Sequence, residues 1–180
     1  MKQIDMTNVR EAGESNRLPV GKYVCVITAV EDCTDKEYLK VSYDIAEGKY
    51  AGHFRSIRSE HPDWVWVGAY VKSYKPKALP MFKRFCSAIS KSNGGFVFDG
   101  GQVNADETTL VGKKLGIIFQ EEEYISNSGD IRTRLIVYSE CPLDKLAEKR
   151  VPDPKRLPAE EKPKEDFVSV SEGTNEDIPF

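Results

Sequence analysis

Two neighbouring segments near the start of the chain constrain its fold most strongly. Residues 20–30 (VGKYVCVITAV) are rich in β-branched side chains, which is typical of a strand buried on much of both faces. Residues 37–46 alternate, with Leu39, Val41 and Ile45 on one face and mainly polar side chains on the other. Because successive side chains of a strand point to opposite faces, this period of two predicts a half-buried strand. The polar loop between the segments predicts an antiparallel pair.

The rest of the pattern adds strands and one helix. Residues 50–58 are predicted as a third strand with Gly52 as a candidate bulge, and residues 113–122 and 130–139 as a final hairpin. Residues 64–71 also alternate, but two glycine-flanked alignments compete and their structure is left open. Phe82, Phe85, Cys86 and Ile89 recur at helical spacing, which predicts a helix over residues 79–90.

The predicted fold class is mainly β. Three strands, one helix and two strands follow one another, which is the order of a five-stranded OB-fold barrel with one helix between strands 3 and 4. Most of the 10 prolines lie after residue 141, among charged residues, where the chain cannot bury enough apolar surface to fold. A short helix over residues 143–150 is expected before the prolines. The predicted organisation is a flexible segment (1–17), the OB-fold domain (18–141), a disordered linker (142–175) and an acidic tip (176–180).

Several classes of protein are excluded. No apolar run approaches the roughly 20 residues of a membrane span, and no apolar N-terminal region indicates a secretory signal, so a cytoplasmic protein without membrane contact is expected. The 4 cysteines form no CxxC pair, which argues against a zinc site. No phosphate-binding loop and no nucleophile with a nearby base is found. We therefore expect no enzyme activity, no cofactor and no metal.

The charge is unevenly distributed. The chain has 26 Lys and Arg against 29 Asp and Glu, for a net charge of −3. Residues 64–98 contain only basic charged residues, whereas residues 165–180 contain only acidic ones. A basic segment and an acidic end on one chain predict two different kinds of partner.

The basic segment is interleaved with aromatic residues. Single-stranded DNA needs cationic groups that follow the phosphates and aromatic faces that stack the bases. On the predicted strands, Tyr38 adds a further aromatic face, and Lys40 and several arginines add further cationic groups. The predicted DNA-binding residues are Tyr38, Lys40, Arg55, Arg58, Trp66, Tyr70, Lys72, Tyr74, Lys75, Lys77, Arg132 and Arg134.

The chain ends in acids followed by Ile-Pro-Phe. A free terminal carboxylate, one aromatic anchor and flanking acids suit a pocket with an apolar floor and a cationic rim. This end closely resembles the acidic C-terminal tip of single-stranded-DNA-binding proteins, which docks replication, recombination and repair enzymes. The resemblance assigns partner docking to Glu176, Asp177, Ile178, Pro179 and Phe180.

The wider pattern resembles small OB-fold single-stranded-DNA-binding proteins of bacteriophages. The segments SYKPKALPMFKRF and VGKKLGIIFQEEEY and the Pro-rich tail carry this resemblance. It implies sequence-independent binding and protection of single-stranded DNA in phage replication or recombination, in the cytoplasm of the host. Two alternatives stay open: an OB-fold adaptor that binds only proteins, and a recombination mediator that anneals strands. Whether the chain forms a homo-oligomer is also open.

Overall fold

The computed structural model describes residues 17–158, and the fold in this range is mainly β. Five strands form one antiparallel sheet in the order β3-β2-β1-β4-β5. The strands are β1 (Lys22–Cys33), β2 (Tyr38–Ile45), β3 (Ala69–Ser73), β4 (Lys114–Ile125) and β5 (Ile131–Cys141). The helices are α1 (His53–Glu60), α2 (Leu79–Ser92) and α3 (Leu143–Leu146), and short 3-10 turns occur at Thr34–Lys36, Pro76–Ala78 and Glu107–Leu110.

Four of the predicted strands and the main helix are confirmed. β1, β2, β4 and β5 coincide with the predicted segments to within a few residues at each end. α2 follows the predicted helix and buries Phe82, Phe85, Cys86, Ala88 and Ile89. The helix expected over residues 143–150 is present as the shorter α3.

The predicted third strand is wrong. Residues 50–58 form a turn and most of α1, while the third strand is β3, which begins at Ala69. Gly52 is not a bulge, because it precedes α1 with a φ of 77° in the left-handed region that glycine tolerates. Phe54 and Ile57 lie one helical turn apart on the side of α1 that faces the sheet. The helix buries Phe54 against Tyr43 of β2 and Phe119 of β4.

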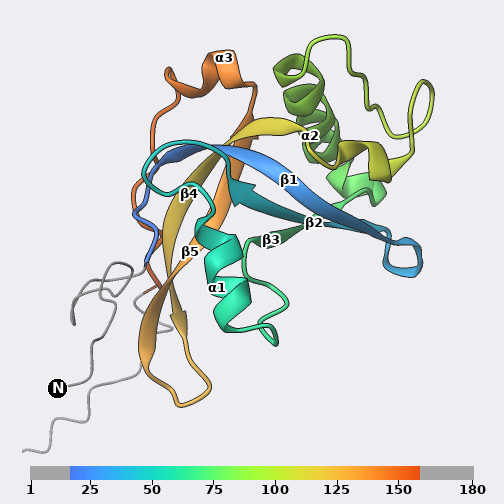
Figure 1. Ribbon diagram of the computed structural model, residues 1–180. Coiled ribbons are helices and arrows are strands. Elements are labelled where there is room, and N and C mark those ends of the chain that lie inside the picture. The colour runs from blue at the N-terminus through green and yellow to red at the C-terminus, as the bar shows by residue number, and fades with distance from the viewer. Residues whose placement is uncertain (1–16, 159–180) are drawn as a thin grey trace, which may run out of the picture.

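The sheet is not closed into a barrel by hydrogen bonds. Its two edges are β3 and β5, and within residues 17–158 no strand pairing joins them. Figure 1 shows the β1–β2 hairpin and the β4–β5 hairpin extending from the centre in different directions, with α1 between them. β1 connects the two halves because it pairs with β2 and, through residues 22–26, with β4.

One apolar core holds the sheet and α2 together. Its fully buried members include Ile27 of β1, Phe85 and Ile89 of α2, and Phe119 of β4. Burying side chains of this size contributes about 1.5–3 kcal/mol each, so this core is the main source of stability. No helix among the described residues is long and apolar enough to cross a membrane.

The predicted linker begins with a segment that contacts the sheet. Residues 151–157 lie beside β4, where the backbone amide of Lys155 donates to Glu121 and that of Glu123 donates to Lys155. Residues 159–175 and the predicted docking residues 176–180 lie outside the described range, as do residues 1–16.

Candidate functional site

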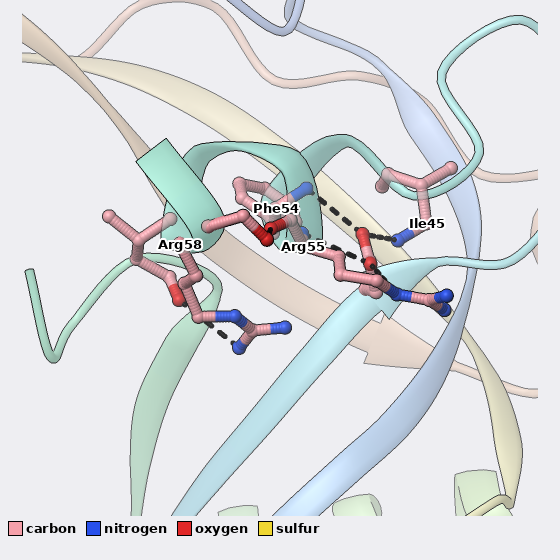
Figure 2. A network of polar contacts seen from close by, with 7 residues as sticks. Ile45, Phe54, Arg55 and Arg58 are labelled. Carbon is pink, nitrogen blue, oxygen red and sulfur yellow. Dashed lines mark hydrogen bonds and ion pairs between the residues drawn. The ribbon is translucent and has the colours of Figure 1, made fainter. Parts of the chain in front are cut away.

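A buried carboxylate fixes the start of α1. Asp44, at the end of β2, is fully buried. Its Oδ1 accepts the amides of Ile45 (2.8 Å) and Phe54 (3.0 Å), and its Oδ2 accepts the amide of Arg55 (3.1 Å). Figure 2 shows these bonds converging on one carboxylate beside the first turn of α1. Because the first amides of a helix lack partners within the helix, Asp44 supplies the cap that the local sequence lacks.

The segment between α1 and β3 is fixed by a hydrogen bond and by a tightly packed glycine. The guanidinium of Arg58 donates to the carbonyl oxygen of Val67 at 3.4 Å, a contact drawn in Figure 2. Gly68 has a φ of 61°, and a Cβ there would lie 2.7 Å from both the Phe54 Cβ and the Tyr43 carbonyl oxygen. Only glycine fits this position, so the chain can pass tightly between α1 and β2. The residues between α1 and β3 are thereby fixed relative to the sheet.

This fixed segment presents two tryptophans to solvent. Trp64 is 50% exposed, and its ring stacks on that of His61 with centroids 4.0 Å apart. Trp66 is 53% exposed, and the Nζ of Lys40 lies 4.9 Å from the centre of its ring. Contiguous exposed apolar residues on a soluble protein mark interaction sites or ligand grooves.

The tryptophans belong to an open groove of about 700 Å³ between the two edges of the sheet. The groove is lined by α1, the segment that follows it, β3, the start of α2 and β5. Its exposed large apolar residues are Trp64, Trp66, Val71, Met81 and Tyr138. Arg17 and Arg134 also line it. We call this region the β3–β5 groove.

Arg134 projects from β5 at the rim of this groove. Its guanidinium lies 5.0 Å from the centre of the Tyr124 ring and 2.7 Å from the Oε2 of Glu122. The side chain is still 57% exposed. An arginine that is stacked and partly exposed is pre-organised for planar or anionic ligands.

Below the groove, a buried ion cluster joins the edges of the sheet. Lys72 of β3 contacts Glu140 of β5, and Arg84 of α2 lies 3.8 Å from the same carboxylate. The side chain of Glu140 is fully buried and that of Lys72 is 10% exposed. Burial raises the pKa of the neighbouring Tyr70 hydroxyl well above its usual value. We call Lys72, Glu140, Arg84 and Tyr70 the β3–β5 seam. Here side chains join β3 to β5, whereas backbone hydrogen bonds join the other neighbouring strands.

The structure brings only some of the predicted DNA-binding residues together. Trp66, Tyr70, Lys72 and Arg134 line the groove, and Lys40 lies over Trp66. Of these, Lys72 is engaged by Glu140 and Tyr70 packs edge-on against Phe85, so both stabilise the seam. Outside the groove lining are Tyr38, Arg55, Arg58, Tyr74, Lys75, Lys77 and Arg132.

Several of these outlying residues have other partners. The Tyr74 hydroxyl donates to Asp32 at 2.7 Å, and this bond raises the pKa of Tyr74 to about 12. Arg132 lies 3.4 Å from Asp130 in the β4–β5 turn. Arg55 lies 3.7 Å from Asp44. Lys75 and Lys77 are exposed ahead of α2.

Five of the groove residues named above were not predicted as DNA contacts: Arg17, Trp64, Val71, Met81 and Tyr138. Tyr138 carried a signal, because it shares the alternating face of β5 with Arg132 and Arg134. Val71 and Met81 carried none, because an exposed apolar side chain looks the same in the sequence as a buried one.

A second hollow runs along α2. It has a volume of about 960 Å³ and lies between α2 and residues 97–102. Leu79, Phe82, Val97 and Phe98 make its surface mainly apolar, and Lys83 lies at its side. We call it the α2 groove.

Neither region has the composition of a metal site. Within residues 17–158, no group of three or more His, Cys, Asp or Glu side chains could hold a metal ion. A comparison with protein-family models finds no match, and a comparison with curated proteins finds none either.

Proposed function

We propose that this chain is a non-catalytic, sequence-independent single-stranded-DNA-binding protein, and that the β3–β5 groove is its DNA site. The observation that carries the proposal is the pair of half-exposed tryptophans held in a groove with cations at its edges. Bases of a single strand are unpaired and stack on such faces, and every base has a face that can do so. Sequence independence follows from that chemistry.

The groove offers distinct groups to the two parts of a nucleotide. Trp64, Trp66 and Tyr138 are the exposed aromatic faces for bases. Lys40 and Arg134 are placed for phosphates, since each has its charged group close to an aromatic ring. Interleaved cations and rings suit a strand whose phosphates and bases alternate along its length.

The strand order supports an OB-fold for this domain. Starting from β1, the neighbours are β2 and β3 on one side and β4 and β5 on the other. Joining β3 to β5 would close the order 1-2-3-5-4-1, with α2 between the third and fourth strands. In this interpretation the barrel is open at one seam, where Lys72 and Glu140 meet. The groove then lies at that opening.

The acidic tip completes the proposed function. Glu176, Asp177, Ile178, Pro179 and Phe180 would recruit replication or recombination proteins to DNA coated by the domain. Deleting residues 176–180 should abolish the binding of such a partner and leave DNA affinity equal or higher. A pull-down in which the shortened chain still retains the partner would refute the docking role.

Substitution of Trp66 tests the DNA site. Trp66→Ala should weaken binding to labelled oligo-dT by about 1–3 kcal/mol for a lost stacked base, whereas Trp66→Phe should retain most of the affinity. Val103→Ala is the control, because Val103 is 73% exposed and lies outside the groove. Equal affinities for Trp66→Ala and Val103→Ala, measured by fluorescence anisotropy, would remove the groove from DNA binding.

The α2 groove favours a second candidate function, a protein-interaction adaptor. Leu79 and Val97 expose 48% and 46% of their surfaces along this apolar hollow, and such patches on soluble proteins often mark protein interfaces. An adaptor would bind no oligo-dT even at about 50 mM salt, where electrostatic binding is strong. Binding under that condition would favour the DNA-binding proposal.

A further inference from the structure

β4 carries three consecutive glutamates beside the β3–β5 groove. Glu121, Glu122 and Glu123 occupy its outer half, where it pairs with β5. Glu122 lies directly opposite Arg134, which lines the groove. Uncompensated carboxylates at this position would repel the phosphates of a bound strand and neutralise Arg134.

A segment from the end of the described chain lies on this part of β4. Residues 150–157, which we call the C-terminal strap, meet β4 through a parallel bridge between Lys155 and Glu122. Lys155 donates its amide to Glu121 (2.8 Å) and accepts that of Glu123 (2.9 Å) on its carbonyl oxygen. The side chain of Gln120 donates to the carbonyl oxygen of Asp153 at 2.6 Å. The strap is thus paired with the later half of β4, which does not pair with β1.

The strap also supplies cations to the glutamates. Lys155 lies 2.6 Å from Glu122, and Arg156 lies 2.6 Å from Glu123. Both carboxylate side chains are only 12% exposed. The hydrogen bond from Lys155, with help from Arg134, lowers the pKa of Glu122. Glu121 lies 3.9 Å from Arg17. Among the described residues, Arg17, Arg134, Lys155 and Arg156 each contact one of these carboxylates, and the last two belong to the strap.

We infer that the C-terminal strap is a positioning element of the DNA site: it masks the charge of the β4 glutamates so that phosphates can approach the rim at Arg134. Lys155 contacts Oε1 of Glu122 while Arg134 contacts Oε2, so Glu122 bears two cations, and the Arg134 side chain remains 57% exposed to a ligand. The inference rests on the proposed function of the β3–β5 groove. It extends the site to residues that composition alone places in a linker.

Substitutions that remove charge test the masking. Lys155→Gln with Arg156→Gln removes both positive charges, keeps a polar side chain at each position and leaves the backbone groups that pair with β4, and should weaken binding to labelled oligo-dT about tenfold at about 50 mM salt. Glu122→Gln with Glu123→Gln should change the affinity little in the intact chain. Combined with the strap substitutions, it should restore most of the lost affinity. Such non-additivity is the sign of direct coupling between the two groups.

A matched pair of substitutions controls for total charge. Lys145→Gln with Lys149→Gln removes the same two positive charges near α3, where Lys145 pairs with Glu148, and should leave affinity within about twofold of the parent. Thermal unfolding of each variant checks that its affinity is measured on folded protein. Additive effects of the strap and glutamate substitutions would overturn the masking role. Absence of oligo-dT binding by the parent chain would instead overturn the proposed function.

Discussion

Lys40 and Lys113 each hold their ammonium group over an aromatic ring, in different parts of the fold. The Nζ of Lys40 lies 4.9 Å from the Trp66 ring centre, and that of Lys113 lies 4.3 Å from the Phe96 ring centre. Only the Trp66 ring lines the β3–β5 groove. Comparing the two pairs therefore shows whether DNA binding needs only a cation over an aromatic ring, or needs that cation in the groove.

Lys40→Ala is expected to weaken oligo-dT binding and to lower the log–log salt slope by about 0.7, the share of one phosphate contact. Lys113→Ala is the matched control and should change neither quantity. Titrations of both variants at several salt concentrations measure this. The assignment of Lys40 to the groove would be contradicted if the two variants had the same slope.

Tyr74 couples stability to alkaline pH. Its hydroxyl donates to Asp32, and this bond raises the pKa of Tyr74 to about 12, above the ordinary value of 10.0. Because the folded chain holds this proton more tightly than the unfolded chain, the contribution is complete below pH 10.0 and is lost as the pH rises to about 12.

Tyr74→Phe should therefore make the fall of unfolding free energy between pH 10.0 and about 12 shallower than in the parent. Tyr43 and Tyr70 also have raised pKa values, so both chains will lose some stability there because burial disfavours their ionised forms. Denaturant unfolding across that range gives the difference between them. Parallel curves would show that the Asp32 bond does not hold the proton.

Among the elements, α1 depends most on a distant residue. Asp44 caps it from β2, and its local sequence places no carboxylate in the first turn. Asp44→Ala would leave three backbone amides without their acceptor and should cost about 3 kcal/mol of unfolding free energy. Asp35→Ala, at an exposed acid, should cost little. Similar costs in denaturant unfolding would show that Asp44 does not stabilise α1.

The β3–β5 seam is the other element-level feature. Glu140→Leu would leave the Lys72 ammonium buried without its main partner and should cost about 3–5 kcal/mol. Lys72→Met combined with Glu140→Leu should cost less than Glu140→Leu alone, because no unpaired charge remains. A double-mutant cycle in denaturant measures the coupling, and additive costs would mean that the pair does not join β3 to β5.

The elements differ in how far the sequence predicts them. β2 and α2 follow from local periodicity, β1 from its run of β-branched residues, and β4 and β5 from the hairpin loop between them. α1 does not, because the carboxylate that caps it lies in β2. The site was predictable where it depends on residue type, as at Trp66 and Lys40. It was not predictable at Lys72, which is buried against Glu140 of β5, or at Tyr70, which packs against Phe85 of α2.

At the scale of the whole molecule, the charges separate into three regions. A groove with cations at its rim lies between the edges of the sheet, a strap compensates the glutamates of β4, and the acids of residues 165–180 follow in the sequence. The overall charge of −3 conceals this arrangement. A protein of this net charge can bind DNA only if its cations are concentrated at the site.

The most direct measurement is a titration with oligo-dT that follows the intrinsic fluorescence of the chain. Its two tryptophans, Trp64 and Trp66, both line the β3–β5 groove, so the signal comes from the proposed site. If the groove binds DNA, the fluorescence is strongly quenched and the affinity falls with salt at a log–log slope of about −0.7 per phosphate contacted. Unchanged fluorescence and no binding at about 50 mM salt would contradict the proposed DNA site.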